Sequence, residues 1–180
     1  MDQLWGEEME QIDKNSDNQL LETIELVRGH LATRKRKQIV TIFQDLHAAD
    51  AADVIEALSS AERSKLVKII RKTFDGSILA ELEDDVRAQI MDQLKTTELV
   101  EAVSSLDSDD AVYVIEDMEQ GAQNKVLQAI PKQDRHKIET ALAFPEDSAG
   151  RIMQREMVMA PEHWTVDDAA ISIKKKPEIA

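Results

Sequence analysis

The sequence has no cysteine and few aromatic residues, glycines or prolines, and each shortage excludes a class of protein. Without cysteine the chain cannot form disulfide bonds or use thiolate chemistry, which fits a reducing compartment. Aromatic residues make up only 3% of the chain, so a core must be built from Leu, Ile, Val, Ala and Met. Five glycines and four prolines are few for an all-β protein with many turns. This composition favours many small helix–helix contacts.

Long apolar runs are also missing. No stretch approaches the roughly 20 apolar residues that cross a bilayer, and the N-terminus lacks a signal-peptide pattern. We therefore expect the chain by itself to be soluble. Its 180 residues suffice for one full domain with a fragment of a second.

Acidic residues dominate the charge. A net charge of −14 argues against nucleic acid as a partner, because phosphate binding requires clustered positive charge. The exception is the basic run Arg34–Lys37, with Arg28 nearby. This run could contact anionic lipid or nucleic acid, or it could be the solvated face of a helix whose apolar side carries Ile39, Ile42 and Phe43.

The clearest organising feature is an internal repeat. A shift of sixty residues aligns identical residues without a gap. The aligned residues are Leu46, Asp50, Ala51, Val54, Ile55, Glu56, Lys65, Ile70 and Lys72 with Leu106, Asp110, Ala111, Val114, Ile115, Glu116, Lys125, Ile130 and Lys132. Leu58, Leu82 and Leu106 show a finer step of twenty-four residues, and the whole pattern indicates units of about twelve residues, each a short helix and a turn.

Helices this short cannot bury their apolar stripe alone. A nine-residue helix is only about 14 Å long, so it must stack on its neighbours, as in an α-solenoid. Apolar residues at helical spacing predict the core. It comprises Val54, Ile55, Leu58, Leu66, Ile70, Ile90, Leu94, Leu99, Val103, Leu106, Val114, Ile115, Val126, Leu127 and Ile130, with Met91 and Met118 as gap fillers.

Capping chemistry predicts where the helices begin. The capping pairs are Ser59 with Glu62, Ser16 with Gln19, Asp107 with Asp110, and Thr165 with Asp168. Pro131 can stand first in a helix because its missing N–H is not needed there. The predicted starts are Ser16, Thr33, Ala48, Ser60, Gly76, Asp84, Thr96, Ser108, Gln120 and Pro131.

We find no catalytic constellation in the sequence and expect no enzyme activity. The four histidines are isolated, and none shares a helical face with a second ligand. Glycines occur singly, so no phosphate-binding loop is present, and no serine lies in a G-x-S-x-G elbow.

Acidic residues crowd the predicted helix start at Asp107, Asp109 and Asp110. Helix capping would explain Asp107 and Asp110, because carboxylates accept the orphan N–H groups of a first turn. It explains Asp109 less well, since a third charge adds repulsion. The alternative is metal binding, because Mg²⁺ prefers carboxylate oxygens.

A change of pattern follows the helical array. Pro145 ends the array, Ser148 begins a linker helix, Met157–Pro161 reads as a short strand, and Trp164–Ile171 reads as a capped helix. The linker sequence, Phe144–Met153, and this strand and helix resemble the MgtE magnesium transporter family from about Leu46 to Ala170.

The resemblance implies an architecture in three parts. An all-α, right-handed superhelix of short helices would cover residues 1–144, and a linker helix would cover residues 145–154. Residues 155–180 would be the incomplete α/β start of a cystathionine-β-synthase-type (CBS) domain. We therefore expect the chain to be part of a longer protein, with residues 155–180 poorly packed, disordered or paired with another copy.

The resemblance also implies a metal site. Its acidic position falls on Asp109, flanked by Asp107 and Asp110. Two further acidic positions of the family fall on Tyr113 and near Ser77, which are not carboxylates. The site would then use fewer or shifted ligands, and candidates for the shifted positions are Asp75, Glu81 and Glu116.

The function implied is a cytosolic regulatory domain that senses Mg²⁺ and gates a transporter or channel electrostatically. Its partners would be the CBS domains of the same protein, in a homodimer, with weak Mg²⁺ binding to this part alone. The full-length protein would be bacterial in type and multi-pass, with this domain on the cytoplasmic side and membrane contact only through a C-terminal part. The alternative is a helical-repeat interaction module, such as a scaffold or a flagellar-motor-switch-like protein.

Overall fold

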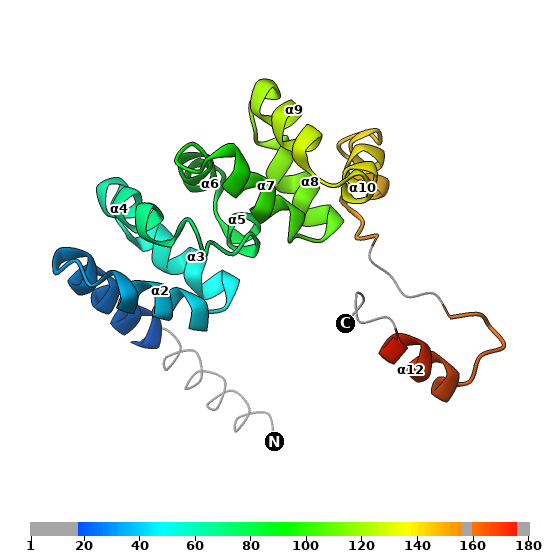
Figure 1. Ribbon diagram of the computed structural model, residues 1–180, viewed down its shortest axis with the longest axis horizontal. Coiled ribbons are helices and arrows are strands. Elements are labelled where there is room, and N and C mark those ends of the chain that lie inside the picture. Colours follow the sequence, from blue (N-terminus) through cyan, green and yellow to red (C-terminus); the bar gives the residue numbers. More distant parts are fainter. Residues whose placement is uncertain (1–17, 156–159, 176–180) are drawn as a thin grey trace, which may run out of the picture.

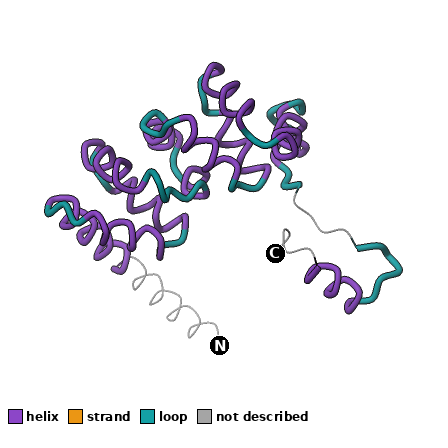
Figure 2. Tube along the Cα trace, in the orientation of Figure 1, coloured by secondary structure: helices purple, strands orange, loops and turns teal. Residues whose placement is uncertain are grey.

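The computed structural model describes residues 18–155 and 160–175, and these residues form helices and turns without a strand. Figures 1 and 2 show the helices up to residue 142 stacked in a row, which confirms the predicted all-α array. A helix covers residues 18–32. It is followed by α2 (Arg36–Asp45), α3 (Ala48–Ala57), α4 (Ser60–Ile70), α5 (Ser77–Glu81), α6 (Asp84–Met91), α7 (Thr96–Ser104), α8 (Ser108–Glu116), α9 (Gln120–Ala129), α10 (Lys132–Leu142), α11 (Ala149–Ile152) and α12 (Val166–Lys175).

Most predicted helix starts are confirmed. Helices begin at Ala48, Ser60, Asp84, Thr96, Ser108 and Gln120, as expected. Gly76 and Pro131 are N-cap residues, so α5 and α10 begin one residue later. The capping box of Ser59 and Glu62 is present, and Thr165 and Asp168 cap α12 reciprocally. Ser16 lies outside the described residues.

The start predicted at Thr33 is wrong. The preceding helix continues to residue 32, and α2 begins only at Arg36. Between them Arg34 adopts a left-handed conformation with a φ of 57°. A side chain with a Cβ rarely occupies this region, so Arg34 interrupts the helix and turns the chain. The spacing of apolar residues does not indicate which residue adopts a left-handed conformation, so it could not predict this break between the two helices.

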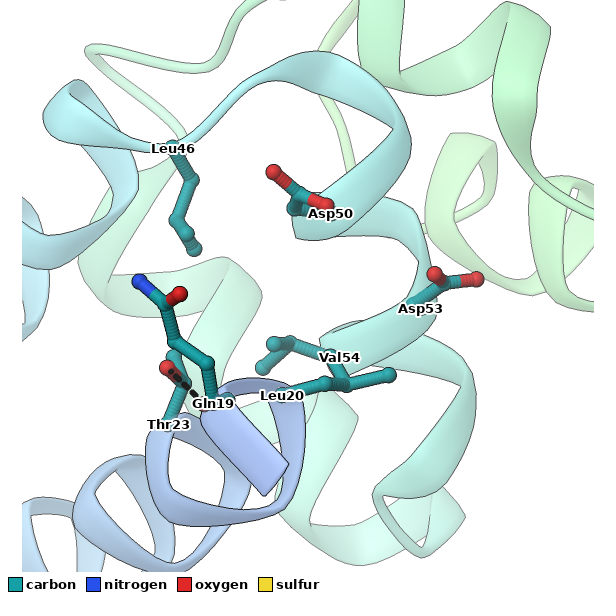
Figure 3. A pocket seen from close by; sticks show the side chains of 7 residues that line it. All are labelled: Gln19, Leu20, Thr23, Leu46, Asp50, Asp53 and Val54. Carbon is teal, nitrogen blue, oxygen red and sulfur yellow. Dashed lines mark hydrogen bonds between the residues drawn. The ribbon is translucent and has the colours of Figure 1, made fainter. Parts of the chain in front are cut away.

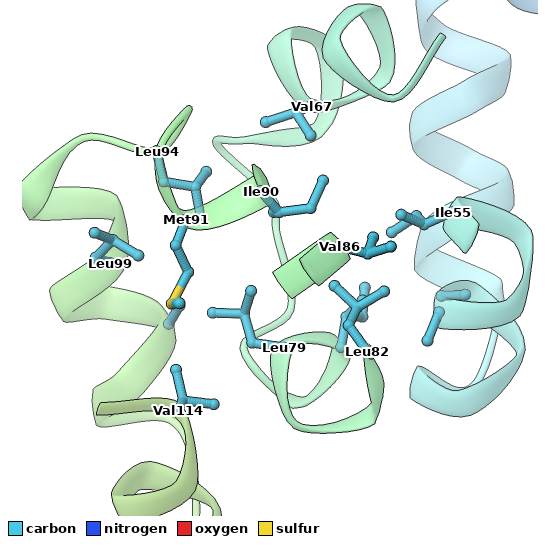
Figure 4. Close-up of a cluster of buried hydrophobic side chains, with 14 of the residues drawn as sticks. Ile55, Val67, Leu79, Leu82, Val86, Ile90, Met91, Leu94, Leu99 and Val114 are labelled. Carbon is cyan, nitrogen blue, oxygen red and sulfur yellow. The ribbon is translucent and has the colours of Figure 1, made fainter. Parts of the chain in front are cut away.

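The core runs along the array because helices pack mainly on near neighbours. The pairs in closest contact include α2 with α4, α3 with α5, α7 with α9, and α8 with α10. Of the fifteen predicted core residues, Leu106 and Leu127 are partly buried and the others are buried. Met91 and Met118 are also buried, and Figure 4 shows Met91 extending between Leu79 and Leu99.

One glycine is required by close packing between α5 and α7. A Cβ at Gly76 would lie 2.1 Å from the carbonyl oxygen of Ala102. That oxygen belongs to backbone and cannot move aside like a flexible side chain. Gly76 therefore fixes how closely the two helices approach.

The segment after the array is described only in part. Ser148 is the N-cap of α11, as predicted, but that helix is a single turn. The predicted strand falls largely on residues 157–159, which lie outside the described residues. Figure 1 shows α12 apart from the array, and Val166 and Ile171 are exposed. Within the described ranges no helix is long and apolar enough to span a bilayer.

Candidate functional site

The acidic turn at the start of α8 is the strongest candidate for a functional site. Asp107 is its N-cap residue, but its side chain makes no capping hydrogen bond. Its Oδ2 instead accepts a hydrogen bond of 2.6 Å from Nε2 of Gln154. Asp107 therefore stands at the predicted N-cap position, but the predicted hydrogen bond from its side chain to the first turn is absent, and Gln154, forty-seven positions later, contacts the carboxylate instead.

The other two carboxylates of the turn are half-buried. Oδ1 of Asp109 is buried and has no hydrogen-bond partner among the residues that the structure describes. Burial raises the pKa of the Asp110 carboxyl, and the nearby charges of Asp109, Asp107 and Glu81 raise it further. The turn thus holds more negative charge than its surroundings compensate.

A shallow cavity of about 220 Å³ lies beside this turn. It is lined by Asp109, Asp110, Val112, Tyr113, Glu116, Arg151 and Ile152. Glu116 is paired with Arg151, whose guanidinium also donates to the carbonyl oxygens of Ala141, Leu142 and Phe144. Because Glu116 is already neutralised, it is a poor candidate for a metal ligand. One side of the cavity is therefore acidic and the other is an internal ion pair.

A buried arginine of α6 contacts the C-terminal half of α8. Arg87 is fully buried, its Nε donates to Asp117 Oδ2 at 2.6 Å, and it is also paired with Asp84. Its NH1 group donates to the Leu82 carbonyl at 2.7 Å. The guanidinium lies 4.2 Å from the centre of the Tyr113 ring, a cation–π distance. The role of Arg87 is not evident from the sequence. The sequence indicates only that a charged residue lies next to the apolar stripe of α6.

The donor set fits only part of a metal site. Across residues 18–155 and 160–175, no group of three His, Cys, Asp or Glu side chains could hold a metal ion. Asp75 accepts the backbone N–H of Ser77 at 3.0 Å, and Glu81 adds to the charge acting on Asp110. The unpartnered oxygen of Asp109 fits a cation ligand, but the remaining ligands of an octahedral Mg²⁺ would have to be water or come from elsewhere.

A second acidic pocket lies at the repeat-related position near the N-terminus (Figure 3). Its volume is about 200 Å³, and its lining includes Asp50 and Asp53 of α3 and Gln19 and Thr23 of the helix over residues 18–32. Asp50 corresponds to Asp110 in the sixty-residue repeat. Both Asp50 and Asp53 are exposed, so water satisfies their charge and this pocket is the weaker candidate.

Comparison with known proteins shows that the acidic turn lies within a known domain family. The family model of the MgtE intracellular N domain matches residues 46–147, which is more than half of the chain. The chain belongs to the MgtE intracellular N domain family. The matched region extends from Leu46, at the end of α2, to the residues after α10. It includes the acidic turn and leaves out the basic run Arg34–Lys37.

One curated protein and one solved structure are also similar to this chain. "Magnesium transporter MgtE" of Bacillus subtilis (strain 168) is 24% identical over 146 residues, which cover 81% of this chain and 32% of the relative. The crystal structure of the soluble part of a magnesium transporter matches with a TM-score of 0.72 and 18% identity. That match covers 89% of this chain and 64% of the other. The chain thus spans about a third of the curated relative.

Proposed function

We propose that this chain is the cytosolic regulatory domain of a magnesium transporter or channel, and that its acidic turn senses intracellular Mg²⁺. The observation that carries the proposal is the unpartnered, buried Oδ1 of Asp109 beside Asp110, whose pKa is raised. Asp109 and Asp110 would be metal ligands, and Asp107 would add to the negative field. Membership of the MgtE intracellular N domain family supports a magnesium-related role.

The proposed gating is electrostatic. Two unit charges about 6 Å apart repel by about 1–3 kcal/mol at an effective dielectric between roughly 80 and 20. A switch from mostly open to mostly closed requires about 5.5 kcal/mol of differential binding. Bound Mg²⁺ would supply positive charge between two acidic surfaces. One ion at this turn would relieve less repulsion than the roughly 5.5 kcal/mol that the switch requires. Several ions would therefore have to lie at the interface.

The other surface would belong to CBS domains of the same protein. We place the helical domain at residues 1–144, the linker at 145–154 and the start of the CBS domain at 155–180. Exposure of Val166 and Ile171 on α12 supports this division, since apolar residues of an incomplete domain lack their partners. In the full-length protein we expect a homodimer on the cytoplasmic side of the membrane, with the membrane-spanning part following this chain.

A magnesium titration tests the proposed site. Because the turn supplies only part of a coordination shell, its affinity should be weak, on the order of 1 mM. Added MgCl₂ should raise the midpoint of thermal unfolding modestly, and Asp109→Asn should reduce that response without unfolding the domain. Asp50→Asn is the matched control, because it removes one carboxylate from the repeat-related turn.

Sodium chloride at matched ionic strength separates binding from screening. If sodium reproduces the whole effect, or if Asp109→Asn responds to Mg²⁺ like the unmodified chain, then the turn is not a magnesium site. The chain would then fit the alternative of a helical-repeat interaction module. Exposed Phe144, Ile152 and Met153 favour that alternative, because they leave apolar surface free for a protein partner.

A further inference from the structure

Charge is segregated along the array. Residues 28–72 carry ten Lys and Arg against five Asp and Glu, whereas residues 73–155 carry eight against eighteen. The basic excess lies on α2, on α4 and on the turn before α2, at the blue and cyan end of the array in Figure 1. A strongly acidic chain therefore has one positively charged end.

Most cations at this end are not used to hold the fold together. Seven of the ten Lys and Arg in residues 28–72 are exposed and form no ion pair within the described part of the chain. One of the seven is Lys72, and the other six lie on α2, on α4 and on the turn before α2. These six are Arg34, Lys35, Arg36, Lys37, Lys65 and Lys68, and we call them the basic surface. By contrast, Arg28 is paired with Glu25 and Arg71 with Glu98.

Two open grooves flank α2 within the basic surface. One, of about 370 Å³, is lined by Leu26, His30, Lys37, Gln38, Thr41 and Ile42. The other, of about 380 Å³, is lined by Arg36, Lys37, Val40, Thr41, Lys68 and Ile69. Both combine aliphatic side chains with lysine or arginine, and Leu26 is 49% exposed.

We propose that the basic surface docks on an anionic phospholipid bilayer. Exposed lysines and arginines interact with acidic headgroups, and neighbouring aliphatic side chains enter the boundary between headgroups and acyl chains. No Phe, Tyr or Trp lines either groove, so the surface lacks the stacking platform that single-stranded nucleic acid requires. A bilayer also requires no shape complementarity, which suits shallow grooves.

The acidic remainder of the chain makes such docking directional. Residues 73–155 would be repelled by an anionic membrane, so only the α2–α4 end can approach it. The inference rests on the proposed function only in that a domain of a membrane transporter is held near a bilayer. The basic surface and the acidic turn are separate, and each can fail alone.

Vesicle flotation of the whole 180-residue chain tests the proposal. We expect binding to an equimolar mixture of phosphatidylcholine and phosphatidylserine at low salt, little binding to phosphatidylcholine alone, and loss of binding at high salt. The triple variant Arg36→Gln, Lys37→Gln and Lys68→Gln should bind the mixed vesicles on the order of 100-fold more weakly.

The matched control is the triple variant Lys95→Gln, Lys125→Gln and Lys132→Gln. It changes the net charge equally at exposed positions outside the basic surface and should bind within about twofold of the unmodified chain. Asp109→Asn should also leave vesicle binding unchanged, so this assay does not depend on the magnesium site. Circular dichroism checks that both triple variants are folded.

Three results would overturn the proposal. The first is no preference for phosphatidylserine, and the second is equal weakening by the two triple variants. The third is salt-sensitive self-association that only the Arg36, Lys37 and Lys68 changes abolish, with no vesicle binding. In that case the basic surface joins copies of the chain and does not contact lipid.

Discussion

The pairs α3–α4 and α8–α9 are two copies of one sequence unit with different surfaces. Ala51, Val54 and Ile55 of α3 are fully buried, and their counterparts Ala111, Val114 and Ile115 in α8 are buried to the same degree. The two units therefore bury the same residue types at equivalent positions of their first helices.

Several of their surface positions differ. Where the α8 unit has Asp107 as its N-cap residue and carries Asp109, the α3 unit has His47 and Ala49. Asp117, which pairs with the buried Arg87, replaces Ala57. The repeat thus keeps its main buried residues and also the carboxylate shared by Asp50 and Asp110, whereas Asp107, Asp109 and Asp117 occur only in the α8 unit.

The largest effects should come from the shared core. Ile55→Ala and Ile115→Ala each remove a fully buried side chain and should lower the free energy of unfolding by about 3 kcal/mol. Urea denaturation followed by circular dichroism measures both. If either change cost less than about 1 kcal/mol, the two units would not be equivalent.

A smaller effect should separate the units. Among the described residues, Asp117→Ala leaves the buried guanidinium of Arg87 with only the exposed Asp84 as a counter-charge, and it should cost about 2–3 kcal/mol. Asp84→Ala, which removes the exposed partner of the same arginine, should cost less than about 1 kcal/mol. Urea midpoints of the two variants test this, and equal costs would mean that burial does not determine which carboxylate matters.

Helix capping differs between the units as well. Ser59 caps α4 with its side chain, whereas Glu119 at the equivalent N-cap of α9 makes no such bond. Ser59→Ala should therefore cost about 1 kcal/mol, and Glu119→Ala should cost much less. Thermal unfolding of the two variants compares them. A comparable loss for Glu119→Ala would show that the Glu119 side chain stabilises the start of α9 without a capping hydrogen bond.

The smallest expected effect concerns the acidic turn. Because burial and neighbouring charges raise the pKa of Asp110 in the folded state, the folded chain binds this proton more tightly than the unfolded chain. Ionisation of Asp110 therefore lowers stability as the pH rises above the ordinary carboxyl range. Asp110→Asn should raise stability at neutral pH by less than about 1 kcal/mol, because the half-exposed group is screened by water.

The control for this pH effect is Asp50→Asn in the α3 unit. Asp50 is exposed, so its replacement should change stability little. Urea denaturation at several pH values measures both variants. An equal gain from Asp50→Asn would attribute the effect to the overall negative charge of the chain.

The sequence predicts helix starts and the core well because both depend on local patterns. The capping box of Ser59 and Glu62 lies within one helical turn and predicts the start of α4. Ala51 and Ile55 are likewise one turn apart, and this spacing predicts that both face the core. The buried arginines could not be predicted in this way. Arg87 and Arg151 are buried because they meet Asp117 and Glu116, which lie thirty and thirty-five residues away.

The same distinction applies to the candidate site. Asp107, Asp109 and Asp110 are adjacent in sequence, so their crowding is visible there. The contacts of these carboxylates depend on how the linker returns to α8. Gln154 of the linker donates a hydrogen bond to Asp107, and one oxygen of Asp109 has no partner among the described residues. The course of the linker back to α8 cannot be predicted from the local sequence and is seen only in the structure.

The packing of each helix on near neighbours along the chain also determines how the chain should fold. Few long loops must close, so the entropic cost of bringing distant segments together is small and folding should be fast. Structure can begin in any adjacent group of helices and spread in both directions. The helix over residues 18–32 has neighbours on one side only within the described array, whereas α5, α7 and α8 lie inside it. Protection of amide hydrogens against exchange should therefore be greatest in the interior helices and decline toward that end.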